Sequence, residues 1–423
     1  MRLNRNLAVT SGLLLLVSLL TVGCGAADPT SVPTKLPPKP TATIVPPTPV
    51  ASLSLIQHYS LVSTGSLKIG REEASAVRLA DGRVLVVGGA IFSSAAMETP
   101  LNAGEIYDPA TGLFTMTDPL ATARFDASAT LLADGRVLVV GGTTTLPQSP
   151  WHQDLTSAEI FNPVTEQFSP TGSLHTAHTL QSANLLADGQ VLVLGGVGSD
   201  TSTSTWDAEL YNPTTGKFTV ITPSLVSNLD GAPGVTLDDG RILSLGYTAD
   251  DAYGDLRGQL YDPKTGKFSL LPDGPARLSM SAAATKLANG DVLIVSGEAA
   301  LMNDAAGNLE EIYHPATNTY TATGPLAEAE LFNTLITLKS GRVLLTSGES
   351  VVGAGGPSFF PNGNNEIYDP ATNTFSALSS NIQTKSNNTI TLLSDGRVLL
   401  IGGSDFSSGE LSSPTASLLA GDQ

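Results

Sequence analysis

The chain has 423 residues, of which only 14% are charged, and its formal net charge at pH 7 is −18. A nucleic-acid-binding protein needs a basic surface to neutralise phosphates, so this charge excludes nucleic acid as a partner. It also argues against electrostatic docking to an anionic membrane. The low charge, with abundant Thr, Ser, Gly and β-branched residues, is typical of an all-β extracellular domain.

The first 24 residues read as an export signal. Residues 1–5 are basic, and residues 7–20 are apolar but too short to span a bilayer as a helix. The only cysteine follows in the run Leu20-Thr21-Val22-Gly23-Cys24. This run resembles the lipobox of bacterial lipoproteins, although Thr21 stands where that motif usually has Leu. The resemblance implies that residues 1–24 are a lipoprotein signal peptide and that Cys24 is lipidated. It places the exported protein at the bacterial cell envelope, outside the cytoplasm. The alternative is a free cysteine in a signal peptide that is cut elsewhere.

Residues 25–51 are rich in Pro, Thr and Ser and contain few large apolar side chains. Such a segment cannot bury a core, and its prolines keep the chain extended. We therefore expect a disordered, semi-rigid tether that holds the following domain away from the membrane.

The rest of the chain, residues 52–423, is a repeat. The phrase Asp-Gly-Arg-Val-Leu-Val-Val-Gly-Gly, or a variant of it, occurs seven times at intervals of 50 to 55 residues. The copies begin at Asp81, Asp134, Asp188, Asp239, Asn289, Ser340 and Asp395. After each, a second phrase related to Glu-Ile-Tyr-Asp-Pro-Ala-Thr-Gly-x-Phe follows at a variable distance. A period near fifty with several short strands per unit predicts a radial array of small sheets.

Each unit reads as one four-stranded sheet. Asp81-Gly82 is a tight hairpin signal, and the apolar run that follows it predicts a strand buried on both faces. The second phrase contains a turn whose last position needs left-handed backbone. That position is Gly or Asn in the units with a clear turn, except at Glu166, where we expect an altered or strained turn. In the first unit the expected strands cover residues 74–79, 84–87, 104–107 and 113–116.

The count of strands predicts how the ring closes. The last unit has a degenerate third strand at 415–419 and nothing after it that could be a fourth, whereas residues 58–62 resemble a fourth strand that precedes the first unit. The sequence therefore predicts an all-β, seven-bladed β-propeller of four-stranded antiparallel blades. The N-terminal strand completes the last blade and so removes the open edges.

The pattern resembles the kelch repeat, and thereby the central propeller of galactose oxidase. The resemblance rests on the double glycine Gly88-Gly89, the aromatics Tyr107 and Phe114, Arg71 and their equivalents in the other units. Two departures stand out. Phe or Tyr replaces the kelch tryptophan of the fourth strand, and the double glycine decays in the middle units.

Candidate binding residues lie on one face. The two classes of tight turn share a face and are short and nearly constant, whereas the links on the other face vary, and such loops usually carry binding. Trp151 and Trp206 lie in these links, and Tyr247 replaces the second glycine of its unit. Exposed aromatics there could stack on a sugar or anchor a protein, although they could equally fold back over the blade ends.

A second register of candidates lies ten residues before each hairpin, at the expected mouth of the central channel. It includes Arg71, Arg124, His178 and Glu330, which could grip an anionic or sugar ligand or pair with neighbouring loops as rim residues.

The sequence favours a non-catalytic scaffold that binds protein or glycan, acts as a monomer and reaches the membrane through the lipid on Cys24. The alternative is a carbohydrate-active or galactose-oxidase-like enzyme with its site on the loop face. No catalytic residue, cofactor or metal site is predicted, because Cys24 is used by the anchor and His175 with His178 make only two ligands. A calcium site at residues 303–308 offers suitable oxygens but lacks the full loop spacing.

Overall fold

The protein was analysed as a computed structural model in which residues 59–423 form one compact unit. The residues described are 59–93, 96–145, 152–196, 208–221, 224, 226, 234–246, 257–271, 282–295, 310–326, 330–331, 334–346, 349–351, 359–360, 365–378, 385, 387–404 and 412–421. Among them there is no helix, and hence none long and apolar enough to cross a membrane. The predicted signal peptide, tether and Cys24 lie outside these ranges and stay predictions.

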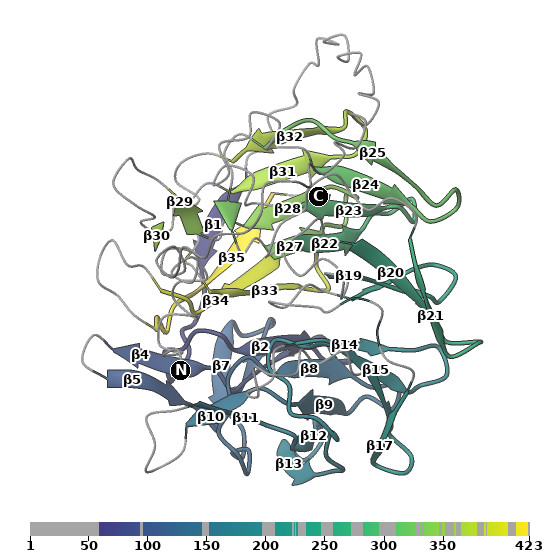
Figure 1. Cartoon of the computed structure of the whole chain (residues 1–423). Helices are drawn as coiled ribbons and strands as arrows, with labels where there is room; N and C mark the ends of the chain where they lie inside the picture. The colour runs from purple at the N-terminus through teal and green to yellow at the C-terminus, as the bar shows by residue number, and fades with distance from the viewer. Residues whose placement is uncertain are drawn as a thin grey trace, which may run out of the picture. The chain divides into compact units, whose positions relative to one another are not determined.

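Seven antiparallel four-stranded sheets form a β-propeller, which confirms the predicted fold (Figure 1). The first blade consists of β2 (Ser75–Arg78), β3 (Val84–Val87), β6 (Gly104–Asp108) and β7 (Leu113–Met116). The second consists of β8 (Ser128–Leu131), β9 (Val137–Val140), β12 (Ala158–Asn162) and β13 (Gln167–Pro170). The third consists of β14 (Ser182–Leu185), β15 (Val191–Leu194), β16 (Ala208–Asn212) and β17 (Lys217–Val220). The fourth blade consists of β18 (Val235–Thr236), β19 (Ile242–Gly246), β20 (Arg257–Asp262) and β21 (Lys267–Leu270). The fifth consists of β22 (Ala283–Lys286), β23 (Val292–Val295), β24 (Glu311–His314) and β25 (Thr319–Ala322). The sixth consists of β27 (Thr334–Thr337), β28 (Val343–Thr346), β31 (Glu366–Asp369) and β32 (Thr374–Ala377).

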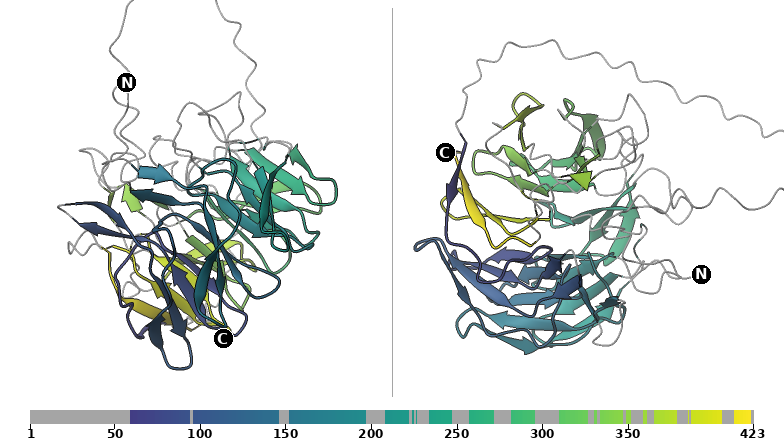
Figure 2. Two further views of the ribbon diagram at one scale, coloured as in Figure 1. Left: turned by 90° about the horizontal axis from the view of Figure 1, so that it is seen from below. Right: turned by 90° about the vertical axis from the view of Figure 1, so that its left-hand side faces the viewer.

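The last blade is closed by the N-terminal strand, as predicted. It consists of β33 (Thr389–Leu392), β34 (Val398–Ile401), β35 (Ala416–Ala420) and β1 (Ser60–Ser63). Strand β1 pairs antiparallel with β35 from Ser60 opposite Ala420 to Ser63 opposite Ser417. Figure 2 shows the dark purple β1 beside the yellow strands of this blade. The first and last described strands therefore share one sheet, which closes the ring.

The second strand of each blade is apolar throughout because it packs against two neighbouring blades. In β3, Val86 contacts a cluster that includes Leu399 of the last blade. Leu85, on the other face of the same strand, packs with Val137 of the second blade. Alternate side chains of a strand point to opposite faces, so a sheet covered on both sides needs a continuous apolar run.

The double glycine brings this strand close to the next blade. Gly88 and Gly89 have φ of 68° and 89°, and Gly89 N donates to Arg124 O at 2.9 Å. A Cβ on Gly88 would lie 2.4 Å from the same carbonyl oxygen. Glycine is therefore required twice over, by its left-handed backbone and by the close approach.

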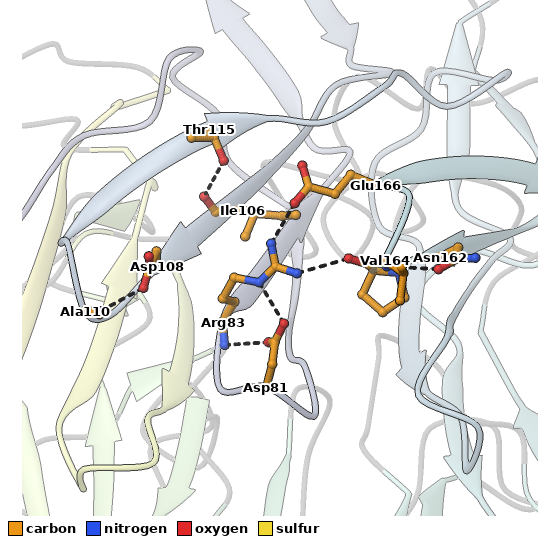
Figure 3. Close-up of polar contacts among 10 residues, drawn as sticks. Asp81, Arg83, Ile106, Asp108, Ala110, Thr115, Asn162, Val164 and Glu166 are labelled. Atoms are coloured by element: carbon orange, nitrogen blue, oxygen red, sulfur yellow. Dashed lines mark hydrogen bonds and ion pairs between the residues drawn. The ribbon is translucent and has the colours of Figure 1, made fainter.

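The two classes of tight turn meet on one face, as expected, and Figure 3 shows the contact. Arg83 Nε donates to Asp81 Oδ2 at 2.8 Å within its own hairpin. Its Nη1 donates to Glu166 Oε1 at 2.6 Å in the turn of the next blade. Glu166 has φ of 55°, close to the 69° of Gly112 at the equivalent position. The turn thus keeps its backbone and is strained, because glutamate disfavours the left-handed region.

Candidate binding face

Short β-ribbons rise from the face opposite these turns. Two lie in the links between second and third strands of the first two blades: β4 (Ala90–Ser93) with β5 (Ala96–Pro100), and β10 (Thr143–Thr145) with β11 (His152–Asp154). A third comprises β26 (Glu330–Leu331), β29 (Glu349–Val351) and β30 (Phe359–Phe360). All three lie on the left in Figure 1. The sequence predicts loops in these links, and the structure instead forms short ribbons there. The β-branched and aromatic residues directly after the double glycines were the signal that could have revealed the ribbons.

The ribbons of the first two blades touch each other. His152 Nε2 lies 2.6 Å from Glu98 Oε2, and the two side chains are only 4% and 13% exposed. The His152 and Phe125 rings also pack in a T-shaped arrangement, with centroids 5.4 Å apart. This buried contact therefore joins β5 of one blade to β11 of the next.

A chain of backbone hydrogen bonds links the inner ends of four consecutive blades. Glu73 N donates to Asn387 O, Asp126 N to Glu73 O, and Leu180 N to Asp126 O, at 3.5, 3.2 and 3.1 Å. These four residues all have positive φ, and each stands two residues before the first strand of its blade. The first strands contact one another from blade to blade, so this chain, which we call the mouth ring, marks the inner rim of the loop face.

The mouth ring is acidic beside the two ribbons. Partial burial raises the pKa of Asp126 to about 7, with further raising by the carboxylates of Glu98, Asp154 and Glu72, partly offset by His152. Burial also raises the pKa of Glu72. Its carboxylate accepts hydrogen bonds from Asn387 Nδ2, Ser404 Oγ and Ser412 Oγ of the last blade, at 3.3, 3.0 and 3.2 Å. Glu72 therefore bridges the seam between the first and last blades.

The structure places Arg71 and Arg124 inside the blades, two positions away from the mouth ring. The guanidinium of Arg71 donates to Glu105 Oε1 at 2.6 Å and to the carbonyls of Gly88 and Ala103 at 2.9 and 2.8 Å. Glu105 Oε2 also accepts from Lys68 N at 2.8 Å. Both ends of the buried pair are thereby satisfied by hydrogen bonds within the first blade.

Arg124 repeats this arrangement in the second blade. It pairs with Glu159 Oε1 at 3.2 Å and has an exposed fraction of 0%. Burial lowers the pKa of Arg71 and Arg124, and Glu105 and Glu159 partly offset the shift. The register of these arginines predicts residues at the rim of the channel, whereas the structure buries both side chains. The signal for their burial is the counter-charge offered by the glutamate of the repeated Glu-Ile-Tyr phrase. The contacts give the two arginines a structural role, and their ligand binding stays a prediction.

The remaining candidates divide into two groups. His178 is buried, and its carbonyl accepts from Gly142 N at 2.9 Å. Glu330 lies in β26, where it pairs with Ser350. Trp151, Trp206 and Tyr247 lie outside the described residues. The structure therefore brings none of the described candidates together at one exposed point.

No protein-family model matches the chain, and no curated protein matches it. Solved structures do. A fungal alcohol oxidase of the AA5 family, in complex with copper, aligns with a TM-score of 0.60 at 15% identity, covering 86% of this chain and 76% of that one. YjhT aligns with a TM-score of 0.50 at 14% identity, covering 75% of this chain and 99% of that one. The fold is that of a kelch-like β-propeller. At these identities the likeness of the propeller concerns the fold alone.

The fold of the copper-containing neighbour raises the question of a metal. Within the described ranges of the propeller, no three His, Cys, Asp or Glu side chains are arranged to hold a metal ion. Three histidines there face carboxylates instead: His152 with Glu98, His175 with Glu209 and His314 with Asp291, at 2.6, 2.8 and 3.0 Å. The described residues therefore do not fit a copper centre, and no chemical step through one is derived.

Proposed function

We propose that this kelch-like propeller is a non-catalytic scaffold whose loop face binds a protein or a glycan, and that a lipid on Cys24 holds it at the bacterial cell envelope. The observation that carries the proposal is the difference between its two faces. The turn face repeats tight hairpins that bond to their neighbours, whereas the opposite face carries ribbons of different lengths on a rigid frame. Binding sites commonly occupy such variable connections.

Two properties of the loop face favour recognition over catalysis. His152 is engaged with Glu98, and Arg71 and Arg124 are buried with glutamates. These side chains are almost fully buried, so they offer little exposed surface to a substrate. Stacking by Trp151 and Trp206 would supply affinity for a sugar ring or a protein side chain.

The full chain in detergent should be screened on a glycan array and in pull-downs from envelope extracts. We expect a retained ligand whose binding is lost in W151A and W206A. The matched control is V164S, since Val164 is 89% exposed on the turn face and its loss should leave binding unchanged. Turnover of a sugar substrate with no retained ligand would instead support the carbohydrate-active or oxidase-like alternative.

The anchor needs a separate experiment. Cells that express the chain are fed labelled palmitate, and the protein is tested for label and for partition into membranes. We expect wild type to be labelled and C24S to be unlabelled and released from membranes. A wild-type chain that carries no label would refute the anchor, while leaving the binding proposal untouched.

A further inference from the structure

The ribbons of the first two blades meet at a group of titratable side chains contributed by four segments. Glu98 comes from β5, and His152 and Asp154 come from β11. Asp126 belongs to the mouth ring. The segment before β2 adds Glu72, which also influences Asp126, and Glu73, whose carbonyl oxygen accepts from Asp126 N at 3.2 Å. The nearby Arg124 is paired with Glu159, so His152 is the basic side chain that faces this group among the described residues.

A close contact and a proton-dependent carboxyl group meet at this junction. His152 Nε2 lies 2.6 Å from Glu98 Oε2 and joins the two ribbons. Neutral Asp126 is compatible with Glu98 and Asp154, but ionised Asp126 repels both. Loss of the Asp126 proton therefore adds a repulsion beside the contact that joins the ribbons.

The carboxylates of this group differ in the hydrogen bonds that hold them. Asp154 Oδ1 accepts from Thr143 Oγ1 at 3.1 Å within its own ribbon, and Glu72 is held by donors of the last blade. Of the carboxylates named, Asp126 has neither a described hydrogen bond from a side chain nor an ion pair. Its backbone, by contrast, is fixed in the mouth ring. Its charge can therefore change without breaking a hydrogen bond that the frame needs.

We propose that the β4–β5 and β10–β11 ribbons form a proton-operated clasp, which the buried contact between His152 and Glu98 holds closed and which loosens when the Asp126 carboxyl group loses its proton. The clasp controls whether the two ribbons are held against each other on the loop face. It goes beyond the proposed binding function and does not depend on it, because the motion belongs to the free protein.

Hydrogen exchange measured by mass spectrometry on the full chain in detergent tests the clasp. Protection factors are corrected for the intrinsic pH dependence of amide exchange and compared between pH 5 and pH 8.5. We expect protection of residues 90–93, 96–100, 143–145 and 152–154 to fall at least about tenfold between pH 5 and pH 7.5, and to level off above. When opening of the ribbons releases one proton, its equilibrium constant rises by up to about tenfold per pH unit. Strand β9, in the blade core, should show no change.

Three variants separate the contributions. D126N, whose asparagine tolerates the positive φ of 52° at this position, should retain high protection at pH 7.5. H152Q should lose protection at pH 5. D188N, in an exposed hairpin on the opposite face, should behave as wild type. The proposal fails if the ribbons show no pH dependence, if D126N keeps the wild-type profile, or if β9 loses protection in parallel, which would indicate global unfolding.

Discussion

Replacing Arg124 by methionine tests whether the buried arginines hold the blades together. The guanidinium donates to the carbonyls of Gly141 and Ser157 at 2.8 and 3.0 Å and to Glu159 Oε1 at 3.2 Å. Methionine fills much of the volume but supplies no donor. Glu159 would keep its hydrogen bonds from Ala121 N and Thr122 N, at 2.9 and 3.3 Å, and would lose its counter-charge in a site that is almost free of solvent.

Breaking a buried ion pair from one side costs about 3–5 kcal/mol. We therefore expect R124M to lower the free energy of unfolding by about that amount. The double variant R124M/E159Q should regain about 1–3 kcal/mol, because it removes the uncompensated charge. The protein already contains a neutral version of this site in its fourth blade, where Gln259 Nε2 donates to Ser244 Oγ at 3.0 Å.

Urea unfolding, followed by tryptophan fluorescence and circular dichroism, measures these differences from the midpoint at a common slope. The matched control is R136M. Arg136 is 37% exposed and pairs with Asp134 at the surface, so its removal should cost about 0–1 kcal/mol. If R124M is no more destabilised than R136M, the structural role of Arg124 is refuted. Its role as a ligand-gripping residue would then become the better explanation.

Three further predictions concern other contacts. Y320F should raise the free energy of unfolding by about 1 kcal/mol, because the Tyr320 hydroxyl is buried with no hydrogen-bond partner among the described residues. The control is Y107F, which loses a 2.8 Å hydrogen bond to Thr64 and should lower the melting temperature, whereas Y320F should raise it. Deleting residues 52–63 should unfold or aggregate the propeller, because β35 becomes an open edge; unchanged melting would contradict the closure. Burial raises the pKa of Glu72 above its ordinary 4.5, so the folded state holds that proton more tightly than the unfolded state. Stability should fall as pH rises from 4.5 through the raised value, and this part of the pH dependence should vanish in E72Q during urea titrations.

The architecture could be predicted from the sequence because its determinants are local and repeat. Hairpins such as Asp81-Gly82 require residue types that the sequence displays directly, and the apolar second strands reveal that both faces are covered. Closure by β1 followed from counting strands. These features need no knowledge of which distant side chains meet.

The interior of the loop face could not be read in the same way. Arg71 looked like a rim residue because an isolated arginine is usually exposed, and its burial depends on Glu105, 34 residues further along the chain. The ribbons were read as loops because the links that contain them vary in length and share no repeated phrase. Their contact through His152 and Glu98 joins two different blades, which a repeat-by-repeat interpretation treats separately.

The mouth ring contains residues with strained backbone, which makes it a candidate functional region. The sequence analysis looked for left-handed positions only where Gly or Asn stood in a repeated turn. Yet Glu73, Asp126 and Leu180 also have positive φ, at 57°, 52° and 58°. Each such residue costs about 1–2 kcal/mol, and strain of this kind persists where the surrounding structure holds it, often at functional sites. Glu73 and Asp126 lie two positions beyond the buried arginines, at the inner rim beside the two ribbons. Ligand-binding variants should therefore be made in the mouth ring and the ribbons before the buried arginines.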